Sequence, residues 1–330
     1  QRQMCIRDRK GGDNMQYSVE EIKQYAAEED VKFIRMAFCD AAGRQKNIAI
    51  MPEELDRAFQ YGIAIDGSAI PGFGGEVHSD LLLRPDPSTL CVLPWRPEHG
   101  RVVRMFCAVT QPDGTVIGAD ARSLLKKTVE DAKKAGLTFA FGTEMEFYLF
   151  RLDEDGEPTK IPYDRAGYMD IAPADKGENV RREVCLTLER MGIRPESSHH
   201  EEGPGQNEID FRYSDPMAAA DNALTFRAVV NTIAVQSGLA ADFSPKPLPG
   251  QPGNGMHINI SARSLGAVNV QVIMESLGGG GHQTMAAAQL KHITPEAAHS
   301  RIQTAIDQYR EAQKKSGLES ESEQKKKDKQ

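Results

Sequence analysis

The sequence predicts an α+β protein that contains more than one domain. Its 330 residues exceed the usual size of a single domain, and 39% of them are apolar against 27% charged. A chain of this composition can bury a sizeable core. Short extended segments bounded by Gly and Pro lie between longer segments with helical periodicity, and this mixture defines the fold class.

Composition argues against several classes of function. Forty Lys and Arg stand against 48 Asp and Glu, and the resulting net charge of -8 has the wrong sign for a protein that neutralises nucleic-acid phosphates. The chain has no run of about 20 apolar residues, the length that a membrane helix needs. Its five cysteines are odd in number and contain no Cys-x-x-Cys pair, which favours reduced thiols. We therefore expect a cytoplasmic protein of small-molecule chemistry, with no nucleic-acid or membrane partner.

Residues 15–118 predict a small α+β domain. Before it, residues 1–14 lack a hydrophobic period, and we interpret them as a foreign leader. Ser18 and Glu21, three residues apart, match a capping box that opens a helix. Further elements are expected at 31–39 (strand), 52–61 (helix), and 89–93 and 102–110 (extended).

A loop at 66–75 interrupts this domain. Its glycines and proline exclude regular structure, and its length suggests that it reaches toward another group. Asp66 begins the loop, and on its own it is most simply a turn-capping carboxylate.

Residues 119–260 predict a second domain of mixed helices and strands. It opens with an amphipathic helix at 119–136. The expected elements that follow are strands at 137–150, 196–201, 206–213 and 256–260, and helices at 178–191 and 216–238.

Beyond residue 261 the chain changes character. A compact segment at 261–312 contains the four-glycine run Gly278–Gly281, and we place a domain boundary at its start. Residues 313–330 carry too few apolar groups to offset the entropy of ordering. We predict a fraying helix end there, followed by a disordered tail.

Glu144 and Glu146 are the first candidate site residues. At a spacing of two on a strand, both carboxylates project from the same face. Two anions on one face repel, and a divalent cation would make the arrangement favourable. The alternative is an exposed sheet face with solvated acids, so a metal site needs further ligands.

Further acids flank a Gly-Pro-Gly turn, where Glu201 and Glu208 stand on two strands that the turn folds together. Both could then face the first pair of carboxylates. His199 and His200 either join them or make hydrogen bonds within the loop. His257 begins a strand after a glycine-rich loop able to bring amides close to an anion, although a lone His there is more often structural.

Taken together, five motifs in this order resemble type I glutamine synthetase over about residues 15–261. They are DGSxIxGF from Asp66, SDLxLxPD from Ser79, EMEF from Glu144, HHEx6E from His199, and GNGMH from Gly253. The resemblance implies a β-grasp-like N-terminal domain and part of a catalytic domain. It also implies ATP-dependent ligation of ammonia to glutamate through γ-glutamyl phosphate, with two or more Mg2+ or Mn2+ ions per site. Active sites formed between subunits imply a homo-oligomer.

The resemblance assigns metal ligands. Glu146, Glu201 and Glu208 match the ligands of the ion nearer glutamate. Glu144 and His257 match those of the ion on the ATP phosphates.

The resemblance also assigns substrate contacts. Gly253 matches a backbone contact to glutamate, and Asp66 matches the acid that helps bind and deprotonate ammonium in the neighbouring subunit's site. Glu196, Tyr213 and Ser261 fall where the family contacts nucleotide, although another aromatic is common at the position of Tyr213.

The second half of the family's catalytic domain is not recognisable beyond about residue 261. Instead, residues 261–312 resemble the end of a DHHA1 domain from a cyclic-di-AMP phosphodiesterase, in which the glycine-rich loop and its His, here Gly278–His282, contact the nucleotide. We therefore hypothesise that two unrelated reading frames are joined near 259–263, and that synthetase turnover is impaired. The alternative is a nucleotide-binding fragment related to those phosphodiesterases.

Overall fold

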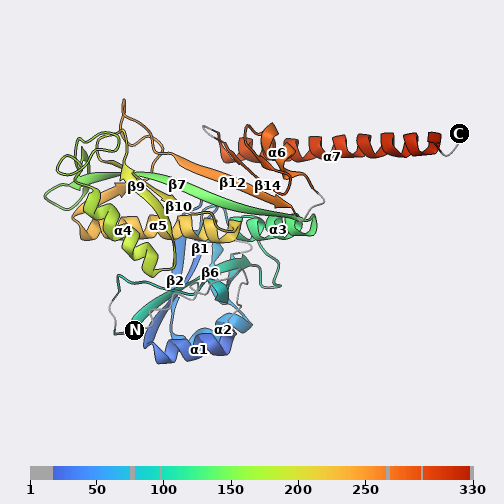
Figure 1. Ribbon diagram of the computed structural model, residues 1–330. Helices are drawn as coiled ribbons and strands as arrows, with labels where there is room; N and C mark the ends of the chain where they lie inside the picture. Colours follow the sequence, from blue (N-terminus) through green and yellow to red (C-terminus); the bar gives the residue numbers. More distant parts are fainter. Residues whose placement is uncertain (1–17, 75–78, 97–98, 265–267, 291–292, 328–330) are drawn as a thin grey trace. The chain divides into compact units, whose positions relative to one another are not determined.

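The computed structural model describes residues 18–74, 79–96, 99–264, 268–290 and 293–327 (Figure 1). The chain divides into two compact units that interleave in sequence. The first contains Gln1–Thr128, Glu146–Arg212 and Ala220–Asn254, and the second contains Val129–Met145, Tyr213–Ala219 and Gly255–Gln330. No helix in the described part of the chain is long and apolar enough to cross a membrane.

A six-stranded sheet organises the N-terminal part of the first unit. Its order is β2-β1-β6-β4-β3, with β5 paired to β6. β1 and β6 run parallel, with Met36 opposite Met105, and the other neighbours are antiparallel. The strands are β1 (Val31–Cys39), β2 (Gln45–Ile50), β3 (Ile63–Asp66), β4 (Asp80–Pro85), β5 (Cys91–Val92) and β6 (Arg101–Thr110).

Two short helices cover this sheet and complete its core. The α1 helix (Val19–Glu28) begins at the predicted capping box, because the Ser18 hydroxyl accepts from the Glu21 amide and the Glu21 carboxylate accepts from the Ser18 amide. It buries Ile22 and Ala26 against the aliphatic core, which also includes residues of α2 (Leu55–Gln60). Among its described residues, this region also contains the 3-10 turns η1 (Pro52–Glu54), η2 (Gly67–Ala69) and η4 (Pro87–Thr89).

The rest of the first unit contains the end of a long strand and its neighbours. From Glu146 onward, β7 (Leu137–Leu152) pairs with β8 (Pro158–Pro162) and β11 (Leu239–Asp242), and the sheet continues in the order β7-β10-β9. β9 (Pro195–His200) and β10 (Gln206–Phe211) are antiparallel. The α4 helix (Glu178–Arg190) lies within this unit. The α3 helix (Ala121–Lys134) belongs to it as far as Thr128, and α5 (Pro216–Gln236) from Ala220 onward.

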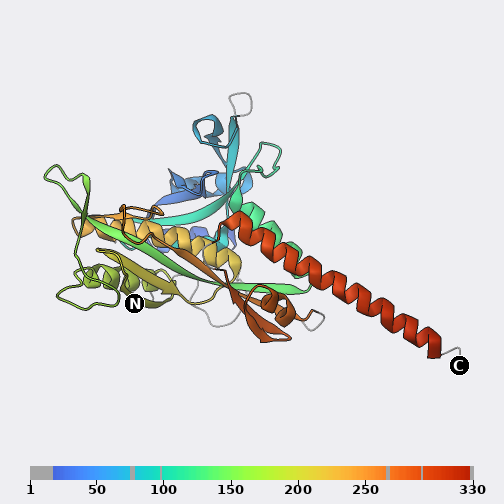
Figure 2. The ribbon, with the colours of Figure 1, turned by 90° about the horizontal axis from the view of Figure 1, so that it is seen from above.

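An aromatic cluster joins α5 to β7. Figures 1 and 2 show α5 lying along this strand, and the Phe226 ring contacts Phe147 with 5.9 Å between ring centroids. Phe211 and Phe243 pack edge-on against Phe226. Large apolar side chains therefore hold the strand that carries Glu146.

The second unit is built on β12 (Met256–Ser264). This strand pairs with β14 (Met285–Gln289) and with the first part of β7, where His257 lies opposite Glu144. β13 (Gly280–His282) pairs with β14. The helices α6 (Val270–Ser276) and α7 (Pro295–Lys327) complete the unit, and its core includes Leu137, Val270, Met274 and Ala305.

Most predicted elements agree with the structure to within a few residues, and β1 has the predicted bounds. The structure describes α7 as far as Lys327, and the disordered tail expected at 313–330 stays a prediction. The Glu, Gln and Lys residues of this last part of α7 have high helix propensity. The leader at 1–14 lies outside the described residues, and the predicted domain boundaries stay predictions.

Candidate functional site

Two acids and an imidazole converge at the turn between β9 and β10. His199 lies opposite Glu208 across the two strands. Its ring nitrogens are each 3.5 Å from a carboxylate oxygen, Nδ1 from Glu201 and Nε2 from Glu208. One ligand atom from each of the three residues lies within 4.8 Å of the others. We call these residues the acidic cluster, and their donor set suits a divalent cation.

Carboxyl groups crowd together at the acidic cluster, which disfavours ionisation of all of them at once. Burial raises the pKa of the Glu208 carboxyl to about 9, and the hydrogen bond with Glu201 and the charges of Asp210 and Glu146 add to the effect. Burial also raises the pKa of Tyr148 to about 12, with smaller contributions from Glu146 and Glu201. A bound cation would relieve this repulsion, so the residues fit a metal site.

Glu146 reaches the same region from β7. Its carboxylate accepts a hydrogen bond of 2.7 Å from the side chain of Gln206, and the same amide donates to the Gly253 carbonyl at 2.9 Å. The Gln206 side chain thus hydrogen-bonds both to a predicted metal ligand, Glu146, and to the predicted glutamate contact, Gly253. The sequence analysis did not single out Gln206.

A second group of polar residues lies behind the acidic cluster and is almost completely inaccessible to solvent. We call it the buried network, and it contains Asp164, Asp175, Arg181, His200 and Asn207. His200 Nε2 is 2.9 Å from an Asp164 oxygen, which also accepts from the Gly205 amide at 3.0 Å. Arg181 pairs with Asp175 and donates to the Asn207 oxygen at 2.6 Å. Through Asp164, the buried network holds both His200 at the end of β9 and Gly205 in the turn between β9 and β10.

The buried network decides between the two interpretations of His200. Burial opposes the charged form of Asp164, but the hydrogen bond from His200 and those from backbone amides hold its pKa below the usual value. Burial likewise opposes the charged form of His200, but the hydrogen bond to Asp164 raises its pKa. His200 therefore acts as a structural hydrogen bonder, whereas His199 joins the acidic cluster.

In the second unit, Glu144 and His257 form a pair of their own. His257 Nδ1 is 3.1 Å from Glu144 Oε2, and Asn259 donates to the other Glu144 oxygen at 2.6 Å. Asn259 follows His257 by two residues on β12, so strand periodicity could have indicated it.

The remaining predicted site residues are Asp66, Glu196, Tyr213 and Ser261. Asp66 is exposed, and its carboxylate accepts from the Ser68 amide at 2.9 Å and from the Ser68 hydroxyl at 2.6 Å. Glu196 is exposed on β9, and Tyr213 is about half exposed. Ser261 lies within β12, between Ala140 and Ala287 of its neighbouring strands.

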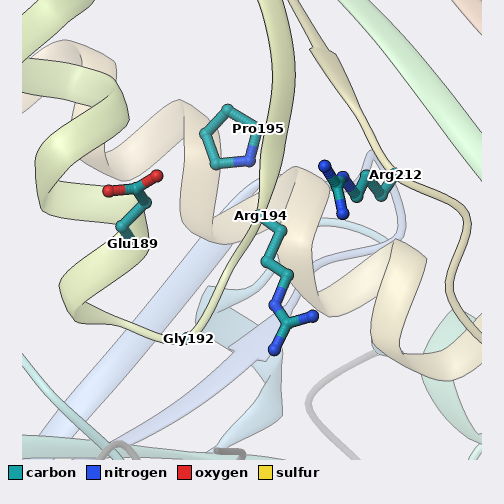
Figure 3. A pocket seen from close by; sticks show the side chains of 5 residues that line it. All are labelled: Glu189, Gly192, Arg194, Pro195 and Arg212. Carbon is teal, nitrogen blue, oxygen red and sulfur yellow. The ribbon is translucent and has the colours of Figure 1, made fainter.

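A hollow of about 350 Å³ lies near the start of β9 (Figure 3). It is lined by Glu189, Gly192, Arg194, Pro195 and Arg212. The Arg212 amide donates to the Arg194 carbonyl at 3.3 Å, so adjacent chain segments present the two arginines. With one carboxylate among its lining residues, the hollow is not a metal centre.

Comparisons with known proteins identify the family. The family description "Glutamine synthetase, beta-Grasp domain" matches residues 30–112, and "Glutamine synthetase, catalytic domain" matches residues 118–287, just over half of the chain. The chain belongs to the glutamine synthetase family. This confirms the predicted family and its β-grasp domain. The catalytic-domain match continues past residue 261, and the DHHA1 resemblance stays a proposal.

Individual glutamine synthetases are similar over most of this chain. The protein of Clostridium saccharobutylicum is 47% identical over 245 residues, which are 74% of this chain and 55% of that protein. The protein of Methanosarcina mazei is 46% identical over 242 residues, covering 73% of this chain and 54% of that protein. The chain thus spans about half the length of these relatives.

Solved structures share the fold. A GmaS/ADP complex superimposes with a TM-score of 0.69 at 25% identity, covering 77% of this chain and 61% of that chain. The Plasmodium falciparum glutamine synthetase has a TM-score of 0.69 at 22% identity, covering 79% of this chain and 59% of that chain.

Proposed function

We propose that this chain is part of a glutamine synthetase that ligates ammonia to the γ-carboxylate of glutamate. ATP would first phosphorylate that carboxylate, and ammonia would then displace phosphate from the acyl phosphate. The acidic cluster is the observation that carries the proposal, because it gathers metal-ligand side chains at the motif that the family shares. Family membership and the order of the five motifs support it.

The proposal includes divalent ions, Mg2+ or Mn2+. In the first unit, Glu146, Glu201 and Glu208 are the proposed ligands of the ion nearer glutamate. In the second unit, Glu144 and His257 are the proposed ligands of the ion that accompanies ATP. When bound, such ions would neutralise the negative charge that develops on phosphate and carboxylate oxygens.

The remaining residues are proposed as substrate contacts on the basis of the family resemblance. Gly253 would contact glutamate through its backbone, and Glu196, Tyr213 and Ser261 would contact nucleotide. Asp66 would help bind and deprotonate ammonium in a neighbouring subunit's site, so the proposal includes a homo-oligomer. A cytoplasmic location is part of the same proposal.

A second candidate function concerns residues 261–312. We propose that this DHHA1-like segment binds a cyclic dinucleotide through Gly278–His282. The segment contributes most of the second unit's apolar core, and its glycine run forms a close-packed hairpin in which a Cβ on Gly281 would lie 2.5 Å from the Ala286 Cα. Titration with cyclic-di-AMP, beside a titration with ATP and Mn2+, separates this candidate from the first.

The proposed ligase activity is tested by glutamine formation from ATP, glutamate and ammonium with Mg2+ or Mn2+. The Glu201→Ala variant serves as the control, after circular dichroism has shown that both proteins fold. Turnover that disappears in the variant supports the proposal. Well-folded wild-type protein without turnover contradicts it for this chain, and equal turnover in both proteins contradicts the role of Glu201.

A further inference from the structure

The Gln206 side chain connects three segments of the first unit. It is fully buried at the start of β10. Its Nε2 donates to Glu146 Oε2 at 2.7 Å and to the Gly253 carbonyl at 2.9 Å, while its Oε1 accepts from the Gly203 amide at 3.0 Å. Glu146 and Gly253 are 60 and 47 residues away from it in the chain.

The partners fix the orientation of this amide. A backbone N–H can only donate, so the amide oxygen must face Gly203. A carbonyl can only accept, so the amide nitrogen must face Gly253. Both N–H groups of Gln206 are then used, one for the Gly253 carbonyl and one for the Glu146 carboxylate.

We propose that Gln206 is a positioning residue that holds the Glu146 carboxylate and the Gly253 carbonyl in a fixed relation. The inference rests on the proposed function, in which Glu146 binds a divalent ion and Gly253 contacts glutamate. The hydrogen bond to Glu146 restricts rotation of a carboxylate that must be oriented to bind an ion. Outer-shell partners of this kind typically change metal affinity about 10- to 100-fold.

Tyr148, which lies on β7 two residues after Glu146, provides a matched control for Gln206. It is fully buried, and its hydroxyl donates to the Pro252 carbonyl at 2.7 Å, one residue before Gly253. Its hydrogen bond therefore tethers the same loop but does not hold Glu146. A purely structural role of the loop tether predicts similar effects of removing either hydrogen bond, whereas positioning of Glu146 predicts an effect on metal binding for Gln206 alone.

The test compares Gln206→Met with Tyr148→Phe in the full chain. Methionine has a similar length and volume but no amide, so all three hydrogen bonds are lost. Mn2+ binding is measured from the electron paramagnetic resonance signal of the free ion. We expect the Mn2+ dissociation constant to rise about 10- to 100-fold in Gln206→Met and less than about threefold in Tyr148→Phe. A folded Gln206→Met variant with wild-type affinity overturns the proposal, as does an equal loss in both variants.

A second measurement tests the positioning role of Gln206 and requires neither bound metal nor enzymatic activity. In nuclear magnetic resonance spectra of the wild-type chain, both Gln206 side-chain N–H protons should exchange slowly with solvent. In Glu146→Ala, one of them should lose this protection. Fast exchange of both protons in the wild type overturns the positioning role. This measurement decides the inference if Gln206→Met does not fold, or if the wild type binds no Mn2+, a result that contradicts the proposed function instead.

Discussion

The buried network and the acidic cluster lie on neighbouring residues of the first unit but balance charge in opposite ways. In the network, Arg181 faces Asp175 and His200 faces Asp164, so each acid has a positive or hydrogen-bonding partner. In the cluster, the Glu201 and Glu208 carboxylates meet beside a single imidazole, and the pKa of Glu208 rises. The comparison indicates that the charged groups of the network stabilise the fold, whereas the carboxyl groups of the cluster require a bound proton or cation.

The largest expected effect comes from breaking the network. Arg181→Leu would leave the Asp175 carboxylate buried without its guanidinium partner, and loss of one partner of a buried ion pair costs about 3–5 kcal/mol. We expect this decrease in the free energy of unfolding, measured by urea titration. Arg182→Leu is the matched control, since its side chain is 64% exposed and pairs with the adjacent Glu183. Equal effects of the two substitutions would contradict the structural role of Arg181.

Removing the ionisable carboxyl of Glu208 from the cluster should act in the other direction. At pH 8 without metal, folding must place a proton on the Glu208 carboxyl, which is ionised in the unfolded chain. Glu208→Gln removes this requirement and should raise the free energy of unfolding by about 1 kcal/mol or more. The same urea titration measures this change, with the exposed Glu202→Gln as control. A decrease in stability would show that the Glu208 carboxylate is already balanced.

The pH dependence sharpens the comparison further. The folded-state pKa of about 9 for Glu208 exceeds its ordinary value of 4.5, so the folded chain keeps a proton that the unfolded chain loses. The stability from this proton is complete below about pH 4.5 and is lost as the pH rises through about 9. Mn2+ binding near pH 7 should therefore release about one proton, as measured by calorimetry in buffers of different ionisation enthalpy. Unchanged proton release in Glu208→Gln would assign the proton to another group.

The smallest change in the free energy of unfolding is expected for a solvent-exposed ion pair. Lys160 pairs with Asp242 at 2.7 Å, but the Lys160 side chain is 63% exposed and Asp242 22%. Lys160→Met should reduce the free energy of unfolding by less than about 1 kcal/mol, because exposed ion pairs contribute little. Repeating the measurement in 1 M salt, where screening is strong, should reduce the difference further. A loss as large as that in Arg181→Leu would show that burial is not what separates the two kinds of pair.

Local patterns predicted the elements of the first unit well. Ser18 and Glu21 indicate where α1 begins, and the mostly apolar run before the turn at residues 40–43 defines β1 as the structure has it. The Gly-Pro-Gly turn predicted that Glu201 and Glu208 lie together, since antiparallel strands joined by a turn bring their ends into contact. These features depend on residues that are close in sequence.

The supporting contacts could not be predicted in this way. Gln206 hydrogen-bonds to Glu146 and Gly253, and Asp164 to His200, across dozens of residues, and no local period specifies these partners. The disorder expected at residues 313–330 from the scarcity of apolar groups stays a prediction, and the structure describes α7 as far as Lys327. The roles of Asp66, Glu196, Tyr213 and Ser261 stay predictions from family resemblance.

Gly203 carries a consequence for engineering this protein. A Cβ built on it would lie 2.0 Å from the Tyr148 hydroxyl and 2.7 Å from the Gln206 side-chain oxygen. The turn resembles a tolerant surface loop in sequence, yet its first glycine leaves no space for a side chain. A saturation library across the turn should retain many residues at the exposed Glu202 and almost only glycine at position 203. Peptide tags and new chain termini should therefore be placed in other loops.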